Sequence, residues 1–349
     1  MQTEIGEANS QRFYLTQRMI KMRLIKIQFL IPVFLLIIGY TDARQKPINQ
    51  ESCEKIDSLD FNHHTPLYTS DCKGFKISEL SNVLNHLFAT GKPIILFVHG
   101  RGYEPNKSLK GGSYVEGNAV HKLEAQYRAR VLMFNWNAEA YLLDRWTPLQ
   151  KTKDAARALS TVLDGIKKYR ASKNQDRPIV LLAHSMGTIV IEKLVSEYGW
   201  PSGTTKLFSN VLFTGGDANA REHDKWVSKI SVAENTYITV NHDDETLAWS
   251  IDQRPDGVLP LGREPGKSLA QNATYIDISR LSSKKGKPTE QHEMFNKAGM
   301  HSQVYVCRFF DVVLKGGQPT FSAGNVETTI GKQRHALKFS RAKDDPCFK

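Results

Sequence analysis

A serine that could act as a nucleophile stands in the segment AHSMG over residues 183–187. This is the G-x-S-x-G pattern with alanine in its first position. A continuous apolar run over 178–182 precedes it, and apolar residues at helical spacing over 188–198 follow. A sharp turn from strand to helix raises the serine hydroxyl above a sheet and requires small residues two places before and after it. The pattern predicts Ser185 as a nucleophile. The alternative is an ordinary turn whose serine caps the helix.

A second segment could stabilise the negative charge that such a nucleophile creates. The apolar run over 93–98 leads into HGRG over 99–102. In acyl-transfer enzymes, the loop after this earlier strand and the residue after the nucleophile each supply a backbone N–H to the oxyanion. We therefore expect the N–H groups of Arg101 and Met186 to form the oxyanion hole. A plain glycine turn is the alternative. A dinucleotide site is disfavoured because the full G-x-G-x-x-G is absent.

The general base must be a histidine that comes after the last strand, in the chain order serine, acid, histidine. Five histidines follow Ser185 in the sequence. His301 lies between an apolar run over 275–278 and a closing helical pattern over 303–315, so we predict it as the base that takes the serine proton. His292, on a polar stretch, is the second choice.

The acid must follow a later strand. Asp244 comes after the apolar run over 237–240 and is the first choice, with Asp243 beside it as a weaker one. Asp217 follows the run over 211–213 and is the alternate acid. One carboxylate is enough to orient the imidazole. The acidic cluster at 242–245 could hold a hard cation but lacks the regular calcium-loop spacing, so we expect no metal and no organic cofactor.

Strand and helix patterns alternate along the middle of the chain. This alternation predicts an α/β fold with a mostly parallel central sheet and helices on both faces. We place the main domain at 91–315, an N-terminal extension at 44–90 and an irregular basic tail at 316–349. The predicted strands are 93–98, 130–136, 178–182, 211–213, 237–240 and 275–278, and the predicted helices are 154–169, 188–198 and 303–315.

Residues 1–43 have the composition of a signal peptide. Basic residues precede an apolar run over 29–40, which is too short to span a bilayer, and small residues follow at 41–43. A compact signal begins at Met22, which could be an alternative start. The alternatives are an uncleaved anchor and a buried helix. We expect a secreted or periplasmic protein.

Export would place the four cysteines in an oxidising compartment. Four cysteines allow three connectivities. The local pairing joins Cys53 to Cys72 and Cys307 to Cys347, so that each bridge fixes a terminal segment. Reduced thiols are the alternative. A zinc site is disfavoured, since no C-x-x-C spacing occurs.

The chain resembles the α/β-hydrolase superfamily of esterases and lipases over about 90–315, on the segments PIILFVHGRG (93–102) and IVLLAHSMG (179–187). The form AHSMG is similar to that of some small bacterial lipases, and the layout is similar to a group of bacterial α/β-hydrolases of unknown function. The resemblance implies an eight-stranded, mostly parallel sheet and a Ser-Asp-His triad. In similar hydrolases Asp-x-x-Leu ends the acid-bearing strand, as Asp244 to Leu247 does here.

These features predict a serine hydrolase that cleaves carboxylic esters through an acyl-enzyme. Two alternatives remain open: an inactive binding module with this fold, and an acyltransferase or thioesterase that uses the same triad. The 349 residues are 40% apolar and 24% charged, which excludes a disordered or polytopic membrane protein. The net charge of +11 predicts attraction to anionic membranes, polyanions or acidic substrates, and an anionic membrane surface is a possible partner. We expect a small-molecule or lipid ester as substrate and no nucleic acid, and the oligomeric state stays open.

Overall fold

The chain divides into two compact units, Met1–Asn49 and Gln50–Lys349. A computed structural model describes part of the second unit, and the predicted signal peptide at 1–43 lies outside the described residues. Within the described part, no helix has both the length and the apolar character needed to cross a membrane. The described residues are 67–70, 74–101, 117–136, 138, 145–173, 175–201, 206–254, 257–279, 281, 288–300, 302–330 and 333–348.

A single sheet of ten strands forms the centre of the described part, in the order β2-β1-β4-β3-β5-β6-β7-β8-β10-β9. Neighbours run parallel from β4 through to β10, while β1, β2 and β9 pair antiparallel. The predicted α/β class with a mostly parallel sheet is confirmed, and short edge strands raise the expected eight to ten. The strands are β1 Leu67–Tyr68, β2 Gly74–Phe75, β3 Ile94–Val98, β4 Arg130–Phe134, β5 Ile179–His184, β6 Phe208–Thr214, β7 Ala233–Val240, β8 Ala273–Asp277, β9 Val326–Ile330 and β10 Arg334–Leu337.

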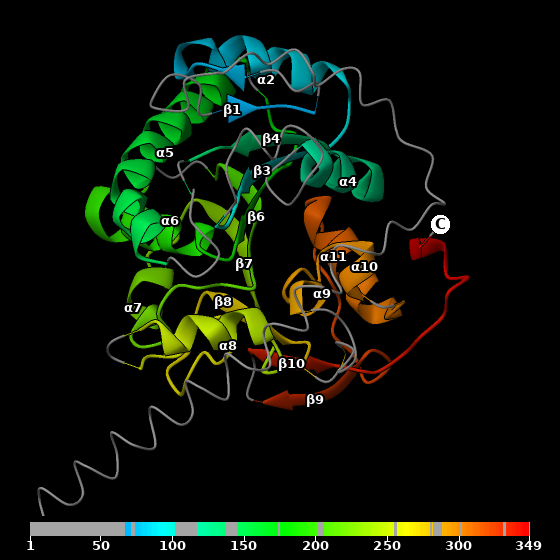
Figure 1. Cartoon of the computed structure of the whole chain (residues 1–349). Coiled ribbons are helices and arrows are strands. Elements are labelled where there is room, and N and C mark those ends of the chain that lie inside the picture. The colour runs from blue at the N-terminus through cyan, green and yellow to red at the C-terminus, as the bar shows by residue number, and fades with distance from the viewer. Residues whose placement is uncertain are drawn as a thin grey trace, which may run out of the picture. The chain divides into compact units, whose positions relative to one another are not determined.

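Helices cover both faces of this sheet. Figure 1 shows α5 and α6 on one side and α4, α10 and α11 on the other. A π-helical turn, η3 at Leu194–Tyr198, continues α6. The helices are α2 Leu80–Ala89, α4 Gly117–Tyr127, α5 Trp146–Lys173, α6 Gly187–Lys193, α7 His223–Val227, α8 Glu245–Asp252, α9 Pro288–His292, α10 Lys297–Met300 and α11 Val304–Leu314, with 3-10 turns η2 Ile77–Glu79 and η4 Pro346–Phe348.

Alternate side chains of the central strands enter two separate cores. In β3, one core takes Ile94, Leu96 and Val98, together with residues of α2, α5 and α6. The other takes Ile95 and Phe97, together with residues of α4 and α11. The alternation follows from the two-residue period of a strand. Because both faces are covered, the strands read as continuous apolar runs in the sequence.

Helix α2 belongs to the first of these cores. Its buried face consists of Leu80, Val83, Leu84, Leu87 and Phe88, which pack in the same cluster as β3 and α5. The main domain therefore begins before residue 91, and the segment predicted as an extension supplies part of its core.

The prediction of an irregular tail over 316–349 is wrong. Strand β10 pairs in parallel with β8, with Arg334 opposite Tyr275 and Ala336 opposite Asp277, and β9 folds back along β10. An uncovered β8 would expose a row of unpaired N–H and C=O groups. The chain returns after α11 to satisfy them.

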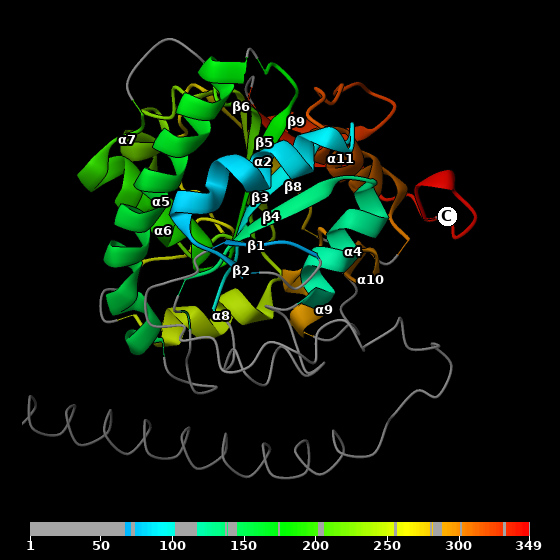
Figure 2. The same ribbon diagram turned by 90° about the horizontal axis from the view of Figure 1, so that it is seen from above.

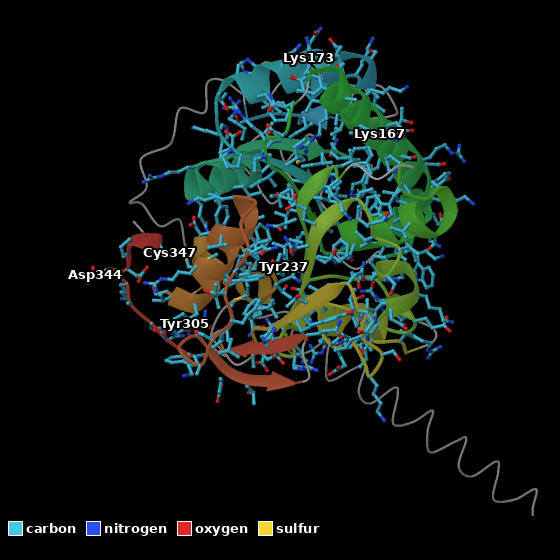
Figure 3. All side chains as sticks on the ribbon, turned by 180° about the vertical axis from the view of Figure 1, so that it is seen from behind. Lys167, Lys173, Tyr237, Tyr305, Asp344 and Cys347 are labelled. Carbon is cyan, nitrogen blue, oxygen red and sulfur yellow. A yellow bond between two sulfur atoms is a disulfide. The ribbon has the colours of Figure 1, made fainter. Side chains whose placement is uncertain are left out.

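The last described residues are fixed to α11. Cys307 is bonded to Cys347, with Cα atoms 6.1 Å apart, and Arg308 Nη2 donates to Asp345 at 2.8 Å. Figure 3 shows Cys347 beside the helices drawn in orange. This bond matches half of the predicted local pairing. Cys53 and Cys72 lie outside the described residues, so their pairing stays a prediction.

Parallel strands bring their carboxyl ends to one end of the sheet. Helix α8 follows β7 directly at this end and packs against α9, as the view in Figure 2 shows. The predicted nucleophile, oxyanion loop and acids all follow strands here, which makes this end the place to look for a site.

Candidate active site

Ser185 stands in a strained turn between β5 and α6. Its φ of 52° lies in the left-handed region, which costs a non-glycine residue about 1–2 kcal/mol. The Ser185 N–H donates to Thr214 O at 3.2 Å, and the Thr188 N–H donates to Ser185 O at 3.0 Å. These bonds from β6 and α6 hold the strained backbone in place. A strand, a sharp turn and a helix occur here as the sequence pattern requires.

Close packing explains the small residues around the serine. A Cβ at Gly187 would lie 2.3 Å from Val98 O and 2.7 Å from His99 O, so no side chain fits there. A Cβ at Gly100 would lie 2.5 Å from Ser185 Cβ. The loop after β3 is thus pressed against the nucleophile turn. Arg101 comes next in this loop and Met186 directly precedes α6, which puts both predicted oxyanion donors in the adjoining segments.

His99 fixes the loop after β3. Its Nδ1 donates to Gly100 O at 2.7 Å, and Trp136 Nε1 donates to His99 O at 2.8 Å. Burial lowers the pKa of His99 from its ordinary 6.5 to about 4, against the opposing hydrogen bonds to Gly100 and Asn135. The ring is therefore neutral at physiological pH, and the loop is held by ordinary hydrogen bonds.

The predicted acid Asp244 is hydrogen-bonded to a histidine. Its Oδ2 accepts from His292 Nδ1 at 2.7 Å, and its Oδ1 accepts from the Leu247 N–H at 2.9 Å as the N-cap of α8. Both side chains are buried. Burial lowers the pKa of His292, but the charge and hydrogen bond of Asp244 outweigh it and raise the pKa above its ordinary value.

Three bonds place α9, and hence His292, beside the start of α8. Asn241 Nδ2 donates to Gln291 O at 2.9 Å, and the Glu245 N–H donates to Gln291 Oε1 at 3.4 Å. Thr246 Oγ1 donates to Pro288 O at 3.3 Å. The residue before the histidine is thus a buried polar anchor, and it brings the imidazole to the carboxylate that ends β7.

His292 and Ser185 both lie against the end of β6, Ser185 at Thr214 and His292 at Gly215, which follows the strand. A Cβ at Gly215 would lie 3.0 Å from both Cε1 and Nδ1 of His292, so the imidazole covers this glycine. The neighbouring Thr214 carbonyl accepts the Ser185 N–H. With Nδ1 donating to Asp244, Nε2 is the basic nitrogen of the neutral ring. The arrangement is that of a base oriented by an acid close to a strained serine.

His184 supports the ring of His292 from the strand side. The two ring centroids are 4.5 Å apart, and Phe295 packs edge-on against His184 at 4.9 Å. Nδ1 of His184 donates to Thr214 O at 2.9 Å. Burial, followed by the charge of His292, holds the pKa of His184 well below its ordinary value, so this imidazole is neutral.

The structure assigns the histidine beside Asp244 differently from the first choice made on the sequence. His301 lies outside the described residues, whereas His292, the second choice, holds the carboxylate of Asp244. Its stretch reads as polar, yet Gln291 and His292 are buried. A usable signal was the apolar pair Met294-Phe295, which begins two residues after His292 and is also buried.

Asp217, the alternate acid, is held by arginines. Its Oδ1 accepts from Arg254 Nη2 at 2.7 Å and from Ser250 Oγ at 2.5 Å, and its Oδ2 lies 3.3 Å from Arg145 Nε. This ion-pair cluster, which sequence analysis missed, leaves Asp244 as the acid with a histidine partner. Asp243 is only partly buried, and no metal-binding cluster of His, Cys, Asp and Glu occurs among the described residues.

A model of the family described as "Alpha/beta hydrolase of unknown function (DUF900)" matches residues 76–298. No curated protein matches the chain.

Similar solved structures include three bacterial and archaeal proteins. A protein of unknown function from Agrobacterium tumefaciens is 15% identical, with 54% of this chain and 81% of that chain covered and a TM-score of 0.28. A putative thioesterase from Silicibacter is 14% identical, with coverages of 58% and 71% and a TM-score of 0.26. An acylaminoacyl peptidase from Pyrococcus horikoshii is 14% identical, with coverages of 67% and 39% and a TM-score of 0.29. Likeness at this level says nothing about the chemistry of this chain.

Proposed function

The chain belongs to the DUF900 family of α/β-hydrolases, and we propose that it is a serine hydrolase of carboxylic esters. Ser185 is the nucleophile, His292 the general base and Asp244 the acid. One observation carries the proposal. A 2.7 Å hydrogen bond joins Asp244 to His292, and the same imidazole lies against Gly215, next to Thr214, whose carbonyl holds the strained backbone of Ser185.

The reaction starts at the serine hydroxyl. His292 Nε2 takes the proton of Ser185 Oγ as this oxygen attacks the ester carbonyl carbon. The carbonyl oxygen gains the negative charge, which the N–H groups of Arg101 and Met186 stabilise. The intermediate then expels the alcohol, which leaves with the proton from His292, and an acyl group stays on Ser185.

Water completes the cycle by the same chemistry. His292 takes a proton from water, the hydroxide attacks the acyl carbonyl, and the acid leaves as the proton returns to Ser185. In a triad of this kind the proton stays on the imidazole and does not pass to Asp244. The role of Asp244 is to hold the tautomer that keeps Nε2 free and to stabilise the imidazolium. These steps need no metal and no organic cofactor.

Two details of the structure favour a working enzyme over an inactive binding module. The chain keeps a left-handed serine, whose strain has no use in a turn that merely links a strand to a helix. It also buries a charged carboxylate against an imidazole, which costs free energy unless the pair has a task or a full set of partners. Both features are what an active triad needs.

A fluorophosphonate probe tests the nucleophile directly. We expect it to label the native chain and not the Ser185→Ala variant, while Ser228→Ala, at the exposed end of α7, keeps full labelling. Chromogenic esters of increasing chain length then report the acyl preference. Failure of the folded native chain to label would contradict the proposal. Product analysis with an added alcohol or a thioester substrate would separate a hydrolase from an acyltransferase or a thioesterase.

A further inference from the structure

The ion-pair cluster of Asp217, Arg145 and Arg254 contains one arginine, Arg254, whose three guanidinium nitrogens all donate hydrogen bonds. Arg254 donates to Asp217 Oδ1 at 2.7 Å, to Asn219 and to the backbone of Asp217, and its Nε lies 3.4 Å from Ser250 Oγ. Ser250 also donates to the same carboxylate oxygen. Oδ1 of Asp217 is therefore well satisfied by Arg254 and Ser250, and Arg254 has a structural role.

Arg145 is buried in the same cluster but makes few hydrogen bonds with the described residues. It is 6% exposed, and its partner among the described residues is Asp217 Oδ2, which lies 3.3 Å from Nε. Charge-assisted bonds of this kind are usually 2.7–2.9 Å long and often bidentate. A guanidinium carries five N–H donors. One long contact is thus all that offsets the cost of burying this charge within the described part of the chain. The two terminal amino groups have no hydrogen bond there.

Arg145 lies next to the catalytic machinery. The N–H of its partner Asp217 donates to Ser185 O at 3.1 Å. Burial lowers the pKa of Arg145, Asp217 opposes this, and the charges of Arg254 and Arg101 add to it, so Arg145 lies within electrostatic reach of the oxyanion loop. The pKa of the nearby Glu192, which also feels both buried arginines, is raised by burial. Two buried guanidinium groups therefore contact Asp217, whose backbone N–H is bonded to the serine turn.

We propose that Arg145 binds a free carboxylate of the substrate, so that the enzyme prefers esters that carry an anionic group. The inference rests on the proposed function. A planar guanidinium whose two terminal amino groups are available matches a carboxylate in a bidentate fashion. The long Nε contact to Asp217 would keep the group oriented while those amino groups face the substrate.

Paired esters of equal shape test the preference. On the acyl side, mono-4-nitrophenyl succinate is compared with 4-nitrophenyl 4-methylpentanoate, in which an isopropyl group replaces the carboxylate. On the alcohol side, 4-acetoxybenzoate is compared with 4-acetoxybenzamide. We expect kcat/KM in one pair to favour the anionic ester about tenfold or more, since a hydrogen bond to a charged group contributes about 1.5–3 kcal/mol.

The variant Arg145→Gln should abolish that preference and leave kcat/KM for the neutral ester within a few-fold of the native value. Arg145→Lys should restore only part of it, because an ammonium is a point charge without the planar fork. Arg157→Gln, on the exposed face of α5, the helix that Arg145 directly precedes, is the matched control and should keep the preference. Equal kcat/KM for both members of both pairs in the native chain, or a preference that survives Arg145→Gln, would overturn the inference.

A binding measurement keeps the inference separate from the proposed function. Calorimetry with succinamate and the Ser185→Ala variant should give binding that the added Arg145→Gln substitution weakens at least tenfold. Equal binding by both would overturn the anion site even if neutral esters are hydrolysed. If no ester is hydrolysed but binding still depends on Arg145, the proposed hydrolase function is wrong and the carboxylate site is supported.

Discussion

The imidazole of His184 packs against that of His292, with centroids 4.5 Å apart and planes inclined by 53°. One residue immediately precedes the proposed nucleophile and the other is the proposed base. Both rings approach Gly215, where a Cβ would lie 3.0 Å from each of them. The orientation of the proposed base therefore depends on a neutral histidine and on the lack of a side chain at Gly215, directly after β6.

Gly215→Ala should raise the activation free energy of the reaction by more than it lowers the free energy of unfolding. The added methyl group displaces the two rings, and a shift of about 1 Å in a catalytic group can cost about a hundredfold in rate. The backbone also has a φ of 53°, which any side chain strains. Gly199→Ala is the matched control, since Gly199 has a φ of 73° with nothing near its Cβ. Equal kcat for both variants would show that the ring contact has no catalytic role.

His292→Asn should reduce kcat/KM for a chromogenic ester by several orders of magnitude, because it removes the imidazole that Asp244 orients to take the serine proton. His301→Asn should change it little. The comparison needs only steady-state rates and a thermal melt to show that both variants fold. The reverse order of effects would return the role of base to the histidine first chosen on the sequence.

Asp244→Asn should lower kcat by about 10⁴-fold with little change in stability, as loss of tautomer support does in serine triads. An asparagine side chain still accepts the Leu247 N–H, so the cap of α8 survives. Asp217→Asn should instead cost about 3–5 kcal/mol in the free energy of unfolding, because two arginines lose their partner. Urea denaturation measures the structural role and kcat measures the catalytic one. If Asp217→Asn were stable but inactive, Asp217 would be the acid of the triad and Asp244 a structural residue.

The rate of the native enzyme should rise with pH as His292 loses its proton. Asp244 raises the pKa of His292 above its ordinary 6.5 despite burial, so the midpoint of kcat/KM should lie above that value. Asp244→Asn removes the carboxylate charge and leaves burial, which favours the neutral ring. The residual activity of this variant should therefore show a midpoint shifted to lower pH. An unchanged midpoint would mean that another group controls the profile.

Stability should fall as the pH drops from about 6.5 to about 4. His99 keeps a pKa of about 4 in the folded chain against an ordinary 6.5, so the unfolded chain binds more protons in this window and unfolding becomes easier. The shift corresponds to about 3 kcal/mol for this residue at the acid end. His99→Gln should flatten the slope of unfolding free energy against pH, measured by urea denaturation. A slope equal to that of the native chain would exclude this cause.

Local patterns in the sequence were enough to predict Ser185, its strand and its helix, because the turn imposes residue sizes at fixed spacing. Asp244 followed from the rule that the acid ends a later strand. The histidine that contacts Asp244 could not be chosen this way, since His292 and His301 both follow β8. The choice depends on α9 folding back onto α8 through Gln291, which is a contact between distant segments with no local pattern.

The arginine cluster and the strands after α11 could not be predicted from the sequence for the same reason. Asp217 has the right position for an acid, and only the folded chain brings Arg254 and Arg145 to it. Strand β10 has four residues, Arg334–Leu337, and its partner β8 lies before three intervening helices. A short polar strand of this kind carries no signal until its neighbour is known.

The position of β10 affects how fragments of this protein should be made. A recombinant fragment that stops after α11 would keep the proposed triad residues but would leave the outer edge of β8 open to pairing with other chains. We expect such a fragment to aggregate or to be insoluble on expression. A lack of activity in this fragment would therefore say little about catalysis. Trimmed versions should therefore retain the residues through Leu337.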